Sequence, residues 1–109
     1  MANPKDEMAK KLKKNTFHAI PDTALVELGK AMLDGKNKYG LMNWRGGNSV
    51  AASAYFDAQL RHLLAWWEGQ QCAEDSGVHH LGHAMACNAI LIDAERRGCL
   101  IDDRPAKGE

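Results

Sequence analysis

The sequence predicts an all-α protein, a small bundle of three main helices with irregular loops that is completed by oligomerisation. Three observations lead to this prediction. Apolar residues recur every three or four positions in three stretches, which begin near residues 22, 49 and 78. Glycine-rich or polar segments separate these stretches. The last stretch is apolar on two opposite faces, which a single chain of 109 residues can hardly cover by itself.

The first helix is expected to begin at Asp22, which suits the N-cap position. Leu25, Leu28 and Met32 then recur on one face. Residues 38–48, with the sequence KYGLMNWRGGN, have no period of their own and are expected to form an aromatic, glycine-rich loop.

The second helix is expected to be capped by Asn48 or Ser49 and to run to about Glu68. At about 100° per residue, one apolar stripe is expected to be its core face. This stripe comprises Phe56, Leu60, Leu63, Leu64 and Trp67. A second group of side chains lies on one flank of this stripe and consists of Tyr55, His62 and Trp66.

The third helix is expected from about Val78 to Arg97, with Gly98 at the C′ position. One face carries His79, His80, His83 and Cys87, followed by Ile90, Leu91 and Ala94. The opposite face carries Leu81, Met85 and Ile92. We interpret this second face as a subunit interface between copies of the chain.

Composition excludes several classes of function. Lysine plus arginine and aspartate plus glutamate both number 14, so a basic surplus for binding extended nucleic acid is lacking, whereas a small anionic ligand remains possible. The chain lacks an apolar run of 18 residues, which predicts no membrane span. Its three cysteines, an odd number without metal-site spacing, indicate reduced thiols in a cytoplasmic protein.

The first 15 residues differ from the rest of the chain. They are rich in lysine and are expected to form a flexible, solvated segment, although a basic arm that touches phosphate is an alternative. Residues 16–109 are expected to form a single helical domain.

The most informative segment is residues 75–83, DSGVHHLGH. Helical spacing places His79, His80 and His83 on one arc, and His62 can face them from the second helix. Such a cluster can bind a metal ion or place a base beside an anion-binding group. The alternative is that these histidines are structural and bond to carbonyls and loop carboxylates.

The carboxylates show a different pattern. None of the 14 has another at i+3 or i+4, the spacing with which helical enzymes usually supply oxygen ligands to Mg²⁺. A Mg²⁺ site would therefore have to gather carboxylates from separate elements: Asp57, Glu68, Asp75 and Asp93 are the candidates. Otherwise the site is rich in imidazole, which favours Zn²⁺, Mn²⁺ or no metal.

The loop after the first helix carries groups that suit a nucleotide. Tyr39 and Trp44 can stack on a base, Asn43 can bond its edge, and Lys38 and Arg45 can bind phosphate. The alternative is a connecting loop anchored by Trp44.

Taken together, these segments resemble the small phage and prophage dATP/dGTP diphosphohydrolases, distant relatives of the all-α MazG-type nucleotide pyrophosphohydrolases. The similarity runs from Phe17 to Pro105. It rests on residues 20–21 (IP), Gly35 with 38–40 (KYG), 43–45 (NWR), 61–62 (RH) with 65–67 (AWW), 75–81 (DSGVHHL) with 83–84 (HA), and 100–105 (LIDDRP).

The resemblance implies a nucleotide-binding domain that hydrolyses a purine deoxynucleoside triphosphate to the monophosphate and pyrophosphate, with a divalent metal (Mg²⁺, Mn²⁺ or Zn²⁺) as cofactor. The residues expected to hold the metal are Asp57, His62, Asp75, His80 and His83. The catalytic residues expected among them are Asp75, His80 and His83. The residues expected to bind substrate are Lys38, Tyr39, Asn43, Trp44, Arg45 and Arg61.

Two other hypotheses belong to different classes. Members of the family commonly carry acidic residues where this chain has Gln70 and Gln71, which favours a phage protein that binds and sequesters a nucleotide signal without cleaving it. A structural helical module that binds zinc is the third hypothesis.

Overall fold

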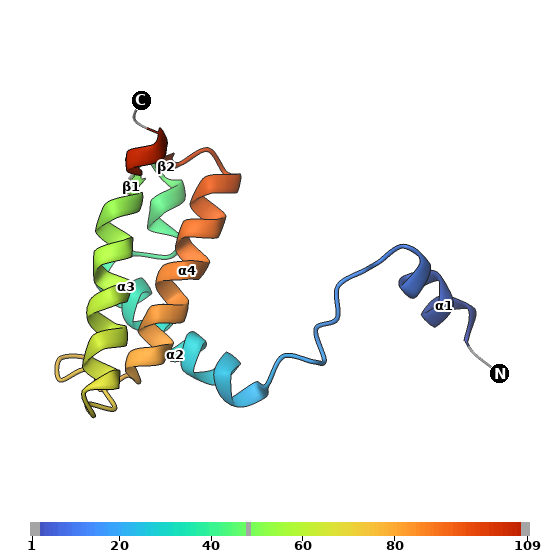
Figure 1. Ribbon diagram of the computed structural model, residues 1–109, viewed down its shortest axis with the longest axis horizontal. Coiled ribbons are helices and arrows are strands. Elements are labelled where there is room, and N and C mark those ends of the chain that lie inside the picture. Colours follow the sequence, from blue (N-terminus) through green and yellow to red (C-terminus); the bar gives the residue numbers. More distant parts are fainter. Residues whose placement is uncertain (1–2, 48, 108–109) are drawn as a thin grey trace.

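The computed structural model, drawn in Figure 1, describes residues 3–47 and 49–107. The described part is mostly helical, which confirms the predicted all-α class. In chain order its elements are α1 (Pro4–Lys11), α2 (Asp22–Tyr39), the 3₁₀ turn η1 (Asn43–Arg45), β1 (Val50–Ala51), α3 (Ala52–Trp67), α4 (His80–Arg96), β2 (Leu100–Ile101) and the 3₁₀ turn η2 (Pro105–Lys107).

The three predicted helices are α2, α3 and α4. In Figure 1, α3 and α4 lie side by side along their length, and α4 also packs against α2. The C-terminal boundaries lie close to those predicted, and Gly98 follows α4 with the positive φ of +71° that favours glycine after a helix. Asp22 is the first helical residue rather than the N-cap, which is Pro21.

A side chain from the C-terminal tail caps α3. The Asp103 carboxylate accepts the Ser53 backbone N–H at 2.8 Å and also accepts the Ser53 hydroxyl. Parallel pairing of β1 with β2 holds the tail beside the start of α3. The predicted cap by Ser49 is therefore wrong, since Ala51 occupies the N-cap position. Asn48 lies outside the described residues.

Small residues make up most of the core. Alanines 31, 52, 73, 84, 86 and 94 are all buried, whereas Trp44 is the bulkiest buried side chain. A close helix contact lies at Gly82 of α4, where an added Cβ would be 2.7 Å from the backbone oxygen of Glu27 in α2. Such small residues let helix backbones approach closely, but they remove little apolar area from water.

The core face predicted for α3 is wrong. Its apolar stripe (Phe56, Leu60, Leu63, Leu64 and Trp67) is exposed, with 60% of Phe56 and 77% of Trp67 accessible to solvent. The face turned inward instead carries Ala52, Tyr55, Ala58, His62 and Ala65, which are buried or half-buried. Periodicity identifies an apolar face but not what covers it, and within this chain α4 packs on the opposite face.

The loop after α2 is fixed to α4 by one carboxylate. Asp93 accepts the Trp44 indole N–H at 2.7 Å and two guanidinium N–H groups of Arg45, each at 2.7 Å. These bonds hold η1 against the C-terminal half of α4 and hold the pKa of Asp93 far below its usual range.

The N-terminal segment stands away from the bundle in Figure 1. Every residue of α1 is exposed except Ala9, which is half-buried. Within the described part of the chain, no helix is long and apolar enough to cross a membrane.

The contact at Gly82 gives a prediction about stability. Gly82→Ala should lower the free energy of unfolding by about 1–3 kcal/mol, because the new methyl group must displace the Glu27 backbone. Gly29→Ala in α2 is the matched control. Nothing lies within 4 Å of its added Cβ, so this change should stabilise the helix by about 0.5–1 kcal/mol. Urea unfolding of both variants measures the difference, and equal effects would contradict the close helix contact.

Candidate functional site

A cavity of about 590 Å³ lies between α2, the loop after it, α3 and α4. We call it the main cavity. Its apolar lining includes Met32, Leu33, Leu41, Met42, Trp44, Tyr55, Ala86, Cys87 and Ile90. Its polar lining includes Asp34, Lys38, Asn43, His62, Asp75 and His83. An apolar pocket with a few polar groups gathered in it is typical of a small-molecule site.

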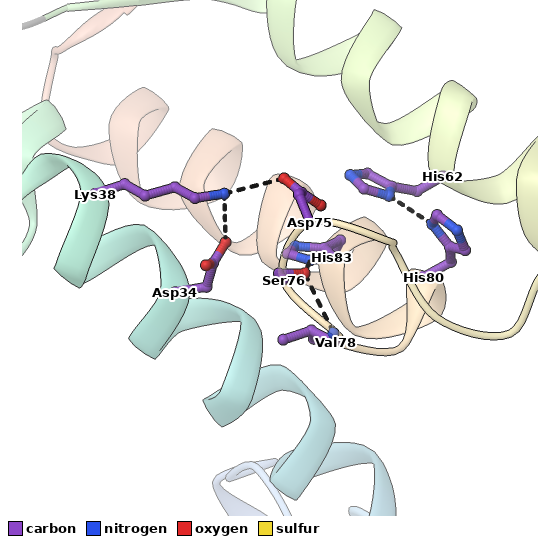
Figure 2. Close-up of polar contacts among 8 residues, drawn as sticks. All are labelled: Asp34, Lys38, His62, Asp75, Ser76, Val78, His80 and His83. Carbon is purple, nitrogen blue, oxygen red and sulfur yellow. Dashed lines mark hydrogen bonds and ion pairs between the residues drawn. The ribbon is translucent and has the colours of Figure 1, made fainter.

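A lysine lies between two carboxylates in the polar part of the main cavity. The Lys38 Nζ atom lies 3.0 Å from Asp34 Oδ2 and 3.3 Å from Asp75 Oδ2. Dashed lines mark these two contacts in Figure 2. Hydrogen bonds to Asp34 and then to Asp75 raise the pKa of Lys38, and the bond from Lys38 lowers the pKa of Asp75. Lys38 and Asp75 are therefore charged at neutral pH, and the ammonium group lies between the two carboxyl groups.

Three histidines meet where α3 faces the start of α4. The Nδ1 atoms of His62 and His80 are 2.8 Å apart, and the His62 and His83 rings stack with centroids 4.6 Å apart. His83 Nε2 is 2.7 Å from the Ser76 hydroxyl, which also accepts the Val78 backbone N–H at 3.2 Å. The loop between α3 and α4 thus fixes His83, while His80 is 6% exposed.

Burial keeps two of these rings neutral. Desolvation is the main cause that lowers the pKa of His62, and the nearby His83 and His80 lower it further. Desolvation is also the main cause that lowers the pKa of His83. Neutral imidazoles can accept protons, so both rings are suited to base chemistry near pH 7.

A second cavity of about 560 Å³, which we call the side cavity, shares lining residues with the main cavity. Arg61, Gln70, Glu74 and His80 line it, and His62 and Asp75 line both cavities. The two cavities therefore share two polar side chains, and the lining of the side cavity adds an arginine.

The structure brings most of the predicted site residues to these cavities. Those that line the main cavity are Lys38, Tyr39, Asn43, Trp44, His62, Asp75 and His83. Arg61 and His80 line the side cavity. Arg45 bonds to Asp93 instead, and the exposed Asp57 lines neither cavity among the described residues. The roles assigned to these residues from the sequence stay predictions.

Sequence reasoning missed Asp34 as a site residue. Its signal was available, because Asp34 stands four residues before Lys38 and so on the same face of α2. His79, the remaining histidine of the motif, caps α4 by accepting the Leu81 N–H at 3.0 Å.

A metal ion needs side-chain nitrogen or oxygen atoms that are able to coordinate it. Within residues 3–47 and 49–107, no three or more His, Cys, Asp or Glu side chains converge as a metal-binding group. Both ring nitrogens of His80 already have partners, His62 and Gln70. Asp34 and Asp75 offer oxygens on either side of Lys38, a pair that fits a hard cation also bound by substrate phosphates.

Comparison with known proteins decides the family. Residues 4–104 match the family described as dATP/dGTP diphosphohydrolase, N-terminal. The chain belongs to this family. The dATP/dGTP diphosphohydrolase of Salmonella phage PMBT28 is 30% identical to it over 60 residues, which are 55% of this chain and 20% of that protein. The similarity to this relative thus spans a fifth of its length. No solved structure matches the chain.

The two depressed histidine pKa values predict how stability depends on pH in this family member. At pH values between the lowered pKa of these rings in the folded protein and the ordinary value of 6.5, His62 and His83 bind more protons in the unfolded chain than in the folded one. The contribution of these rings is complete above pH 6.5 and is lost as the pH falls through the folded pKa. The urea midpoint should therefore drop between pH 7.5 and 5.5.

His62→Asn should weaken this pH dependence, whereas His18→Asn in the exposed N-terminal segment should leave it unchanged. The same slope in all three proteins would show that other groups cause it.

Proposed function

We propose that this chain hydrolyses purine deoxynucleoside triphosphates to the monophosphate and pyrophosphate. The observation that carries the proposal is the main cavity itself. An apolar, aromatic wall and a cluster of cation, carboxylates and neutral imidazoles line one pocket, in a member of a family named for dATP/dGTP diphosphohydrolases.

The apolar wall suits a nucleoside. Tyr39 is exposed and Tyr55 is half-buried, so aromatic faces are available for stacking on a base, whereas Trp44 lines the wall as a buried side chain. Asn43 lines the same wall and has an amide that can bond a base edge. The volume of about 590 Å³ lies within the range of about 300–1,000 Å³ for small-molecule sites.

The polar lining suits a triphosphate. Lys38 is in the main cavity, and Arg61 is beyond His62 in the side cavity. A phosphate chain that extends from Lys38 past His62 would reach Arg61, so that both cations neutralise charge on the leaving pyrophosphate.

Divalent cation dependence is part of the proposal. Asp34 and Asp75 would hold the ion together with phosphate oxygens, and Asp75 belongs to the ligand set predicted from the sequence. When bound, such an ion would supply Lewis-acid polarisation of the phosphate.

The side chains of this protein would perform the proton transfer. A water oxygen attacks the α-phosphorus while a neutral imidazole in the main cavity accepts its proton. The bond from the α-phosphorus to the bridging oxygen breaks, and pyrophosphate leaves with the electron pair. Lys38 and Arg61 stabilise the negative charge that develops on the leaving group.

Binding without cleavage is the second candidate. Gln70 and Gln71 are neutral, and Gln70 bonds to His80 at 2.9 Å, so an amide stands beside the histidine cluster where relatives are expected to carry an acid. This arrangement would bind a nucleotide without adding a catalytic carboxylate.

Turnover of dGTP and dATP with Mg²⁺ or Mn²⁺ tests the two candidates. Monophosphate should appear by chromatography, and Asp34→Asn or Asp75→Asn should reduce the rate by about 100-fold or more, since each removes a group beside the reacting phosphates. Asp22→Asn, at the exposed start of α2, is the matched control and should keep full activity.

Calorimetry with the same nucleotides completes the test. Tight binding without turnover would replace the hydrolase with the binding protein, and no binding of either nucleotide would exclude both candidates.

We also propose that a second copy covers the α3 stripe defined above. The accessible surface is 8366 Å², against roughly 6,000 Å² expected for a folded monomer of 12.0 kDa. The exposed N-terminal segment contributes to this excess, and so does the stripe. The five exposed side chains of the stripe present roughly 500 Å² of accessible surface per copy. This is more than half of the area of about 800 Å² that a standard interface buries on each partner.

Light scattering distinguishes the two apolar faces. Leu64→Arg on the α3 stripe should shift the protein from dimer to monomer, because a charge cannot be buried there without a partner. Ile92→Arg, on the face of α4 predicted from the sequence, is the matched control because Leu64 and Ile92 are 54% and 57% exposed. Dissociation by Ile92→Arg alone would assign the interface to α4, and a monomeric wild type would exclude both faces.

A further inference from the structure

We infer that Gln70 is a positioning residue: through His80 it fixes the tautomer of His62 and leaves His62 Nε2 as the proton acceptor in the main cavity. The catalytic part of this inference rests on the proposed hydrolysis, whereas the tautomer is a property of the free protein. Hydrogen bonds that join Gln70, His80 and His62 in series carry the argument.

The first bond sets the proton on His80. The Gln70 side-chain oxygen lies 2.9 Å from His80 Nε2, while the Gln70 side-chain nitrogen lies 3.5 Å from a Glu74 carboxylate oxygen. Because a carboxylate accepts, Glu74 orients the amide with its nitrogen outward and its oxygen toward His80. An amide oxygen can only accept, so His80 must carry a proton on Nε2.

The second bond passes this constraint to His62. The two hydrogen-bond partners of the buried His80 ring are an amide and another imidazole. A neutral ring protonated on Nε2 accepts at Nδ1. The 2.8 Å separation of the two Nδ1 atoms therefore requires His62 to donate from its own Nδ1.

The lone pair of His62 is then on Nε2. Figure 2 shows this ring with one nitrogen bonded to His80 and the other on the side of Asp75, a residue that lines the main cavity with His62. The other two rings are less available: His80 uses both nitrogens, and His83 Nε2 is bonded to Ser76. His62 Nε2 is thus the acceptor best placed to take a proton from an attacking water.

This assignment changes the roles predicted from the sequence. His80 becomes the residue that orients the base, and His62 becomes the base. When water loses its proton, the O–H bond breaks and an N–H bond forms at His62 Nε2, while Nδ1–H stays bonded to His80. A wrong tautomer removes the lone pair from the reacting side, which is costly in other enzymes that use a histidine base.

Histidine ¹⁵N NMR of the free protein at pH 7.5 tests the inference directly. In the wild type, His62 should carry its proton on Nδ1 and His80 on Nε2. In Gln70→Glu, the new carboxylate favours a doubly protonated His80 whose Nδ1–H now donates to His62. His62 should then carry its proton on Nε2, the reverse of the wild type.

Gln71→Glu is the matched control, because it makes the same charge change one residue away. Gln71 lies 3.0 Å from His79 Nε2 and not beside His80, so the His62 tautomer should stay as in the wild type. Gln70→Leu adds a variant without new charge, in which loss of the acceptor should leave His62 as a mixture of tautomers. Circular dichroism checks that each variant is folded.

Turnover gives the second readout. Gln70→Glu should lower kcat by about 100-fold with little change in KM, whereas Gln71→Glu should match the wild type. A wild-type His62 protonated on Nε2, or a Gln70→Glu variant with raised turnover, would overturn the inference. If the tautomers are as expected but the protein cleaves no nucleotide, the positioning role of Gln70 is supported and the hydrolase is excluded.

Discussion

The close contact between α2 and α4 at Gly82 is the constraint on which the site depends. Because Gly82 has no side chain, the backbone of Glu27 can lie directly against α4. From that contact α2 continues along the bundle and brings Asp34 and Lys38 to Asp75, a residue of the loop between α3 and α4. The ion pairs between elements distant in sequence are therefore a consequence of helix packing, and the packing depends on one missing methyl group.

The small residues that allow this packing also explain the rest of the arrangement. Helices that meet through alanine and glycine bury little apolar area, so large apolar side chains remain at the surface and polar ones can lie inside. The inward face of α3 presents His62 to α4, while its Phe56 and Trp67 face outward. The interior of this bundle thus contains a network of imidazoles and a hydroxyl, which the exposed Gln70 amide joins from the surface.

The site contains both charged groups and neutral imidazoles, and different interactions set the protonation of each. Lys38 has two carboxylate partners, which lower the tendency of its ammonium group to lose a proton, and in turn Lys38 lowers the pKa of Asp75. The imidazoles of His62 and His83 are neutral because burial disfavours their charged form. A cavity that combines fixed charges with a neutral proton acceptor has the groups that general-base chemistry on a polyanionic ligand would need.

The sequence by itself determined the three helices, because their apolar period and the glycine after α4 are local signals. It also identified the segments that form the site, since histidines three and four apart share a helix face. Only the tertiary structure decided which face of α3 is covered, that Asp34 joins Lys38 and Asp75, and that Gln70 contacts His80. These features depend on helix-to-helix distances, which are set by steric contacts such as that at Gly82 and have no periodic signature along the chain.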